Sequence, residues 1–380
     1  VPILAGGRLS GKAGGYNVGV LNMQTREVND VVPGNNFTVA RVSRELPNRS
    51  RAGVIFVNRA VTGLESVSGV TNQTYGADAK WGIGRYSSIE GYVAKTSTPE
   101  LSGRDYAFNV SAEHDSPTWL MSAGYREVGE SFHPTVGFLR RDDYRRPSAM
   151  VLYRWRPDDL WGLLELRPHA SYYGYWKPDG FYESGKLHVD NHWEWRSGWE
   201  LHTGINFTTE GVLEPFQIYP GVFVPPGTYD HTEAQIVGMT NQGAPLSLQV
   251  RLIAGGFFGG TRASTTTELR GRIGDSFNAY VDYLRNDVSL PTGDFVTNLL
   301  RMRLSYSFTT NMYVQALIQY NDVIDNWSTN LRFGWLQAAN SGLYVVYNEN
   351  RDPRSSDVGG IGLRDRSLII KYSHTFDLLD

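Results

Sequence analysis

The feature that most constrains this chain is a regular alternation of apolar and polar residues over short segments. In "RMRLSYSFTTNMYVQALIQY", residues 301–320, Leu304 and Tyr306 alternate with Arg303 and Ser305. Successive side chains of a β-strand point to opposite faces of a sheet, so this period of two predicts strands with one apolar and one polar face. The fold must therefore provide an apolar environment along one side of each such strand.

The same alternation recurs along the chain, and no segment has a sustained helical period. It is clear at 192–207, 246–252 and 268–283, which we expect to be strands. Short turns are expected near 11–15, 47–50, 84–88, 115–118, 156–160, 196–198, 241–245, 274–276, 308–311 and 338–342. Mostly longer connections lie between them, at 26–35, 61–72, 130–142, 211–229 and 351–362. Short periplasmic turns at one end and long extracellular loops at the other are typical of outer-membrane barrels.

The number of expected strands also fits a barrel. We count about 21 strands, and bacterial single-chain barrels have an even number, so we expect roughly 22 strands, with 20 as the alternative. An expected count of 22 places one further strand before Val1. Residues 1–380 are therefore predicted to be one antiparallel transmembrane β-barrel domain that lacks an upstream strand.

Composition argues against several other classes of protein. A nucleic-acid-binding protein usually carries an excess of basic residues, but the net charge here is −3. The lack of cysteine excludes disulfides and thiolate metal sites. No run of about 18 apolar residues is present, so we expect no transmembrane helix. A sandwich does not need this many strands, and a propeller would repeat about every 40 to 50 residues, which we do not find. A large soluble β-protein is the other alternative.

Aromatic residues make up 13% of the chain, and several tryptophans fall near expected strand ends. Aromatic girdles at both membrane interfaces are a feature of outer-membrane barrels. The tryptophans concerned are Trp155, Trp161, Trp195, Trp199, Trp327 and Trp335.

The expected loop at 130–147 has the densest group of charges. It contains Arg140, Arg141, Asp142, Asp143, Arg145 and Arg146. If the loop folds into the lumen, these side chains would form a constriction that selects solutes by charge. Arginine suits this role because it stays ionised and binds carboxylate or phosphate through two hydrogen bonds. The alternative is a structural clamp in which Arg–Asp pairs hold the loop against the barrel wall.

The polar rows of the last third are strongly cationic. Arg251, Arg270, Arg272, Arg301, Arg303, Arg332 and Lys371 are expected to point into the lumen. Only Glu268 and Asp282 oppose them in the same rows. An excess of positive charge would favour anions in a water-filled channel, whereas an ion-paired ladder across neighbouring strands would stiffen the wall.

A second polar group mixes histidines with carboxylates. Its members are Glu165, Arg167, His169, His188, Asp190, His192, Glu194, Glu200 and His202. These residue types suit a metal or acid–base site, but along one strand face they are about 7 Å apart per step. We therefore expect a hydrated polar wall, with no metal and no cofactor. Since no nucleophile elbow, P-loop or zinc-protease motif occurs, no enzymatic activity and no catalytic residue are predicted.

Three stretches carry a family resemblance: "VPILAGGRLSGKAGGYNVGVLNMQT" at 1–25, "FHPTVGFLRRDDYRRPSAMVLYRWRP" at 132–157, and "NLRFGWLQAANSGLYVVYNENRD" with "DRSLIIKYSHTF" near the end. Together they resemble a family of uncharacterised C-terminal barrel domains of Gram-negative bacteria. In that family the barrel usually follows a domain resembling carbohydrate-binding family 9. The resemblance implies an outer-membrane location, with lipid, lipopolysaccharide and an upstream sugar-binding domain or other protein as partners.

The end of the chain supports the same location. Leu368, Ile370, Tyr372 and Phe376 form one row, which resembles the recognition signal of the barrel insertion machinery. The "DLLD" tail after Phe376 departs from that signal, which usually ends on the aromatic residue.

Under this interpretation the predicted role is passive: a porin-like conduit, or an anchor that displays a domain or partner. One alternative is the barrel of a carbohydrate uptake or export system. A second is a gated TonB-dependent-transporter-like barrel, which would need an N-terminal plug and a TonB-binding segment not present in this sequence.

Overall fold

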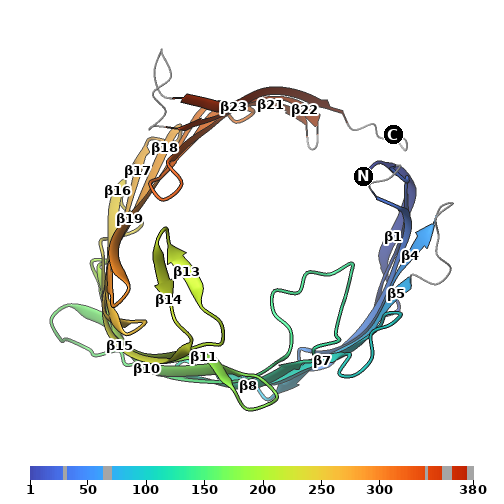
Figure 1. Ribbon diagram of the computed structural model, residues 1–380, viewed down its shortest axis with the longest axis horizontal. Coiled ribbons are helices and arrows are strands. Elements are labelled where there is room, and N and C mark those ends of the chain that lie inside the picture. The colour runs from blue at the N-terminus through green and yellow to red at the C-terminus, as the bar shows by residue number, and fades with distance from the viewer. Residues whose placement is uncertain (29–31, 63–70, 339–340, 353–361, 375–380) are drawn as a thin grey trace. The chain divides into compact units, whose positions relative to one another are not determined.

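The computed structural model describes residues 1–28, 32–62, 71–338, 341–352 and 362–374. Within these residues the chain forms strands β1 to β23, of which twenty-one belong to one sheet and two form a separate hairpin (Figure 1). All paired neighbours run antiparallel. Among the described residues, no helix is long and apolar enough to span a membrane.

The chain divides into two compact units, which we describe separately. The first comprises Val1–Arg154, His169–Leu187 and Thr209–Gly211, and the second comprises Trp155–Pro168, His188–Thr208 and Val212–Asp380.

The first unit holds the strands β1 (Ile3–Ala13), β2 (Tyr16–Thr25), β3 (Gly34–Leu46), β4 (Ser50–Thr62), β5 (Thr71–Ile83), β6 (Ser87–Ser97), β7 (Tyr106–Asp115), β8 (Trp119–Val128) and β9 (Tyr144–Tyr153). Each pairs with the next in sequence. β10 (Leu163–Trp176), β11 (Tyr182–Trp195) and β12 (Glu200–Val212) contribute residues to both units.

The second unit continues with β15 (Gly227–Met239), β16 (Leu246–Phe257), β17 (Gly260–Ile273), β18 (Phe277–Leu290), β19 (Gly293–Thr309), β20 (Met312–Asn321), β21 (Asn326–Ala338), β22 (Ser341–Asp352) and β23 (Gly362–Ser373). These strands also pair in sequence order. The two-stranded hairpin consists of β13 (Phe216–Tyr219) and β14 (Val222–Val224).

The short turns have the backbone geometry that hairpins need. Gly14 and Gly15 join β1 to β2 with φ of 57° and 81°. Two consecutive positive φ values match the right-handed twist of the flanking strands, and glycine adopts them without a steric penalty. The expected turn at 11–15 is therefore confirmed, although most of its residues belong to the strands.

The second unit also contains two short connections that were not identified from the sequence. Residues 258–259 and 291–292 are two-residue turns. Phe258 and Gly259 both have positive φ, 44° and 79°, which closes the chain tightly after β16. The neighbouring strands are long, with 14 residues in β18 and 17 in β19. Residues that could have formed a longer loop are therefore part of these strands.

The sidedness predicted from the alternation is confirmed in both units. In the first, Val42, Val54, Ala77 and Val93 lie side by side across four neighbouring strands. Val54 and Val93 are 57% and 55% exposed, so among the described residues nothing covers this apolar row. In the second, Leu304 lies between Ala279 and Ala316 on one face.

Buried apolar side chains gather instead in two small clusters. One contains Ala107, Val128, Phe132 and Tyr144, and the other contains Val222, Val224, Val288 and Leu290. A soluble sheet protein buries its apolar rows against a second layer. Here the rows stay exposed, which argues against the soluble alternative.

The tryptophans lie where interface residues are expected. Trp195 ends β11, Trp199 precedes β12, and Trp327 and Trp335 lie near the two ends of β21. The other two, Trp155 and Trp161, lie in the connection between β9 and β10, and Trp161 is 78% exposed.

Candidate functional site

In the first unit, the connection 129–143 between β8 and β9 folds back over the polar face of the sheet (Figure 1). Asn72, a buried residue at the start of β5, holds it: its amide nitrogen donates to the carbonyl oxygen of His133 at 2.7 Å. Its amide oxygen accepts from the backbone N–H and the hydroxyl of Thr135 at 3.2 and 2.9 Å. The hydroxyl of Thr96 on β6 accepts from the His133 N–H at 3.0 Å. The segment thus crosses several strands to reach β5.

Charged contacts clamp the C-terminal end of this segment. Asp143 forms an ion pair with Arg104 and lies 3.7 Å from the Lys177 ammonium. Arg141 lies 3.5 Å from the carboxylate of Glu183, and its guanidinium stacks 4.3 Å from the ring centroid of Tyr175. These contacts are those that a structural clamp requires.

The tip of the segment has a different character. Val136 and Phe138 are 41% and 88% exposed, so apolar groups project from a segment that lies over a polar face. Arg140 and Asp142 are also exposed, and among the described residues neither has an ion-pair partner within 4.0 Å. The segment therefore presents both apolar and charged groups to whatever occupies this face.

The expectation that Arg145 belongs to the same constriction is wrong. The strand β9 already begins at Tyr144, so residues 144–147 are not loop. Since consecutive residues of a strand alternate between faces, Arg145 and Arg146 point in opposite directions. Arg146 lies beneath the segment, 5.1 Å from the Tyr173 ring centroid, whereas Arg145 pairs with Glu127 on the other face at 3.5 Å.

In the second unit, the β13–β14 hairpin lies over the sheet in a comparable way (Figure 1). Val222 and Val224 pack against Val288 and Leu290 of β18, which share a face with the polar residues Tyr280 and Asp282. The rings of Tyr219 and Phe295 stack with centroids 4.6 Å apart and planes within 3°. The segment 211–229, a long connection expected from the sequence, thus covers part of the polar face.

All seven cationic residues expected from the last third share the polar face of this unit. The strand register aligns them with neutral polar partners in most cases, for example Arg303 with Tyr280 and Arg332 with Gln315. The members are Arg251, Arg270, Arg272, Arg301, Arg303, Arg332 and Lys371.

Two of the seven cations are neutralised locally. Arg270 lies 2.9 Å from Glu268, and Arg301 lies 2.8 Å from Asp282. The two carboxylates face each other across β17 and β18, so the flanking guanidinium groups also relieve their repulsion. Of the residues the structure describes, no carboxylate lies within 4.0 Å of the other five cations. The ladder and the cationic surface therefore coexist on one face.

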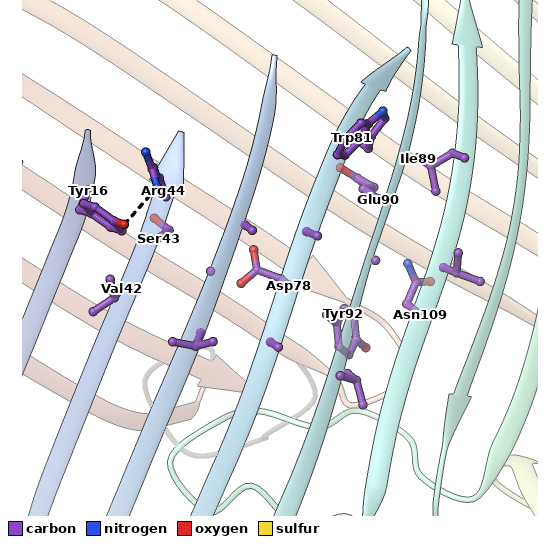
Figure 2. A pocket seen from close by; sticks show the side chains of 18 residues that line it. Tyr16, Val42, Ser43, Arg44, Asp78, Trp81, Ile89, Glu90, Tyr92 and Asn109 are labelled. Carbon is purple, nitrogen blue, oxygen red and sulfur yellow. Dashed lines mark hydrogen bonds between the residues drawn. The ribbon is translucent and has the colours of Figure 1, made fainter. Parts of the chain in front are cut away.

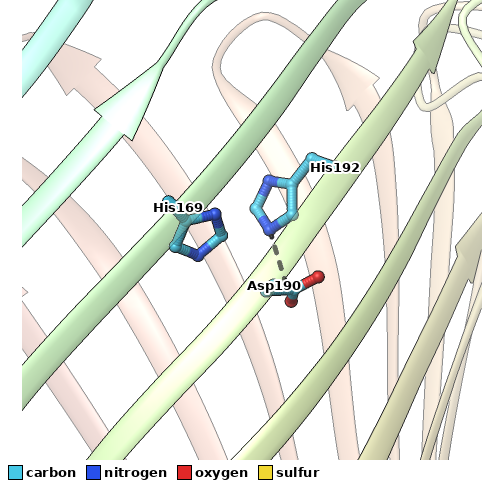
Figure 3. Close-up of side chains that lie close together, drawn as sticks. All are labelled: His169, Asp190 and His192. Carbon is cyan, nitrogen blue, oxygen red and sulfur yellow. Dashed lines mark ion pairs between the residues drawn. The ribbon is translucent and has the colours of Figure 1, made fainter.

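Within the second unit, the histidine and carboxylate cluster centres on Asp190, whose side chain is fully buried. The Nε2 atoms of His188 and His192 lie 3.3 and 3.7 Å from Oδ2 of Asp190, and Figure 3 shows the second of these pairs. The other oxygen, Oδ1, accepts from the Thr203 N–H at 2.9 Å, and His188 Nδ1 contacts Asn206 Oδ1 at 2.6 Å. Imidazole and carboxylate are ligand types for Zn²⁺, and the same groups also form ion pairs when the imidazoles are protonated.

A neighbouring arginine joins three carboxylates of this cluster. Arg167 lies 3.1 Å from Glu200, 3.3 Å from Glu194 and 3.7 Å from Glu165. His202 lies 3.2 Å from Glu200 and stacks on His192 with ring centroids 3.5 Å apart. This dense network matches the polar wall that the alternation predicts.

The apolar face of the first unit carries a shallow groove of about 760 Å³ (Figure 2). Small residues such as Ala77 and Gly91 form its floor, and Trp81 and Ile89 lie at one end. At the other side Arg44 donates to the hydroxyl of Tyr16 at 3.2 Å. Apolar side chains of this face would contact acyl chains in a membrane barrel.

Several residues that organise these sites were not identified from the sequence. Asn72 and Arg104 anchor the 129–143 segment, and His231 accepts the Phe258 N–H at 2.7 Å, next to the hairpin cluster. Each is a single polar residue in or beside a strand, a pattern shared with most polar positions of the chain. Their partners lie far away in sequence, so the sequence contains no local signal for them.

No family model matches the chain, and no curated protein matches its sequence. The resemblance to uncharacterised C-terminal barrel domains therefore stays a prediction, and Phe376 lies outside the described residues.

Solved structures do match. The ferric enterobactin receptor of Pseudomonas aeruginosa is 9% identical over 93% of this chain and 71% of the receptor, with a TM-score of 0.55. The ferric-catecholate import receptor Fiu of E. coli (8% identity, 96% and 70% coverage) and the ferric preacinetobactin receptor of Acinetobacter baumannii (9%, 96% and 69%) give lower TM-scores of 0.48 and 0.47. Of these three structures, the enterobactin receptor has a TM-score above 0.5, and identity this low bears on the fold alone. With its antiparallel strands, this chain has the fold of an outer-membrane β-barrel.

Proposed function

We propose that the chain is a porin-like conduit for small hydrophilic solutes, with a preference for anions, in the outer membrane of a Gram-negative bacterium. The observation that carries this proposal is the set of five cations on the polar face of the second unit with no carboxylate within 4.0 Å among the described residues. In a barrel this face lines the interior, where uncompensated positive charge raises the local concentration of anions.

The two segments that cover the polar faces would then narrow the passage. The segment 129–143 brings Arg140 and Phe138 over the first unit's polar face, and β13–β14 covers part of the second. A charged ring selects by sign, and an apolar constriction gates by dewetting. This is the role that we assign to the exposed tip of 129–143.

Planar lipid bilayers test the proposal. The full chain is reconstituted, and the reversal potential is measured across a KCl gradient. A steady conductance with a reversal potential of the sign for chloride preference is the expected result. A cation-selective conductance would contradict the proposed anion preference.

A sealed anchor is the second candidate, because the same two covering segments could close the passage. A chain without conductance that begins to conduct after deletion of 214–225 would support the anchor. We propose no catalytic role in either case. Outer-membrane lipid, lipopolysaccharide, the barrel insertion machinery and an upstream sugar-binding domain are the partners that we propose.

Two further roles follow from other observations. The fold likeness to the ferric enterobactin receptor supports a gated importer, for which opening would depend on a specific solute. The family resemblance supports a carbohydrate uptake or export system, and binding of the purified protein to a glycan array tests that role.

A further inference from the structure

A cavity of about 270 Å³ opens on the polar face of the second unit, at the end where turns join β15 to β16 and β17 to β18. Three arginines line it, with polar but uncharged neighbours between them. The side chains concerned are Arg270, Arg272, Arg303, Ser247, Asn278 and Tyr280. No carboxylate is among the lining residues.

The strand register explains why the three arginines meet here. Ser247, Arg270, Tyr280 and Arg303 occupy one rank across β16 to β19. Arg272 lies in the adjacent rank, aligned with Asn278. Because residues two apart on a strand share a face at a spacing of about 7 Å, the guanidinium groups surround a common space. The arrangement follows from pairing and does not depend on a mobile loop.

The charge of the cavity is not balanced by its neighbours. Glu268 pairs with Arg270 at 2.9 Å, and Asp282 of the same next rank pairs with Arg301. Arg272 donates to the carbonyl oxygen of Gly243 at 3.2 Å, a neutral acceptor. Three lining cations and one contacting carboxylate therefore leave an excess of two positive charges. All three arginines are exposed and accessible to a solute.

We propose that this cavity binds a phosphoryl group, as inorganic phosphate or as the phosphate of a small phosphorylated solute. A phosphate near neutral pH has a charge between −1.5 and −2 and three or more acceptor oxygens. Each guanidinium presents a planar fork of donors that can take two oxygens. A carboxylate has one charge and two oxygens, so it matches one arginine well but not three around a cavity.

This proposal names the solute class of the proposed conduit, but the binding itself does not require conduction. The exposed guanidinium groups are partly screened by salt, since the Debye length is about 8 Å at physiological ionic strength. We therefore expect weak binding that weakens further as salt is added.

Binding to the purified full chain in a non-phosphate detergent tests the site. Inorganic phosphate is titrated at low ionic strength, and broadening of its ³¹P NMR line gives the Kd. R303Q removes a lining cation that has no carboxylate partner within 4.0 Å among the described residues. R251Q is the matched control, because Arg251 is an exposed arginine of the same face outside the cavity.

We expect R303Q to raise the Kd for phosphate about fivefold, since a charge-assisted contact to an exposed site is lost. R251Q should change it less than about twofold. Equal effects of the two variants, or no phosphate binding by the unaltered chain, would overturn the proposal. Binding of acetate or succinate as strong as that of phosphate would also overturn it.

A second titration separates the two sources of the phosphoryl group. Glucose 6-phosphate that binds as well as or better than inorganic phosphate supports a phosphorylated solute, and clearly weaker binding supports the free ion. If the chain binds phosphate but does not conduct in bilayers, the proposed conduit is refuted and the proposed phosphate site is not. Conduction without phosphate binding would refute the site alone.

Discussion

The side-chain amide of Asn72 donates a hydrogen bond to the carbonyl oxygen of His133 at 2.7 Å, and the two residues are 61 positions apart in the chain. This contact joins the start of β5 to the segment 129–143 across the intervening strands. Because Asn72 is only 5% exposed, the bond is shielded from water and difficult to replace. It fixes where the segment crosses the polar face.

The first prediction concerns this anchor. N72A removes the contacts to His133 and Thr135, and it leaves the carbonyl oxygen of His133 without this donor. We expect the segment to lose about 2–3 kcal/mol of local stability. Hydrogen exchange on the reconstituted protein should become faster in 129–137 and stay unchanged in β15–β19.

T74A is the control for this experiment. Thr74 lies two residues after Asn72 in β5, on the same face of the sheet. Among the described residues, no hydrogen bond joins its side chain to the segment. Its replacement should leave exchange in 129–137 as it is. If hydrogen exchange in 129–137 is equally slow in N72A and in the unaltered chain, Asn72 does not anchor the segment.

The second prediction concerns the β13–β14 hairpin. V222D places a charge in the buried cluster with Val288 and Leu290, where ionisation would cost several kcal/mol. We expect the hairpin to leave the sheet, with exchange in 216–224 faster by about tenfold or more. F223D changes the adjacent residue, whose side chain is 49% exposed, and should leave the hairpin docked. Fast exchange in both variants, or in neither, would refute the packing.

The third prediction concerns charge selectivity. Replacing Arg251, Arg303 and Arg332 together by glutamine removes three of the five cations without a carboxylate partner within 4.0 Å among the described residues. The ratio of chloride to potassium permeability should fall by about twofold or more, because the fixed field that concentrates anions is reduced. Reversal potentials in planar bilayers measure the ratio.

R44Q provides the comparison for the triple variant. Arg44 shares the apolar face with Val42 and Val54, away from the polar rows. Its loss should not alter the permeability ratio. A triple variant with the ratio of the unaltered chain would show that the cationic rows do not set selectivity.

The strand architecture was predictable because a local rule, the alternation of apolar and polar residues, identifies strands and their two faces. Alternation in 301–320 predicts that Leu304 and Ala316 lie on the apolar face and Arg303 on the opposite one, and the structure places Leu304 between Ala279 and Ala316. The same rule predicted the cationic face from Arg251 to Lys371. The two-residue turn at Phe258 and Gly259 was not among the turns expected from the sequence, because its local composition resembles that of an extended strand.

The covering segments were not predictable in the same way. The charges at 140–146 indicated a special segment, but its path depends on Asn72 and Arg104, which are distant in sequence. Arg145 was assigned to the loop because β9 begins at Tyr144, earlier than the charge pattern at 140–146 suggests. For 211–229 the sequence predicted a long connection, and only the structure identifies Val288 and Leu290 as its partners.

Single-cysteine labelling along β19 tests the central claim, the sidedness of the strands, most directly. The chain has no cysteine, so R303C, L304C, S305C and Y306C each provide one reactive thiol without background. In lipid vesicles, a charged membrane-impermeant maleimide should label the thiols at 303 and 305 through a water-filled passage, and lipid should shield those at 304 and 306. Labelling of all four positions, or labelling of 304 and 306 alone, would contradict the account.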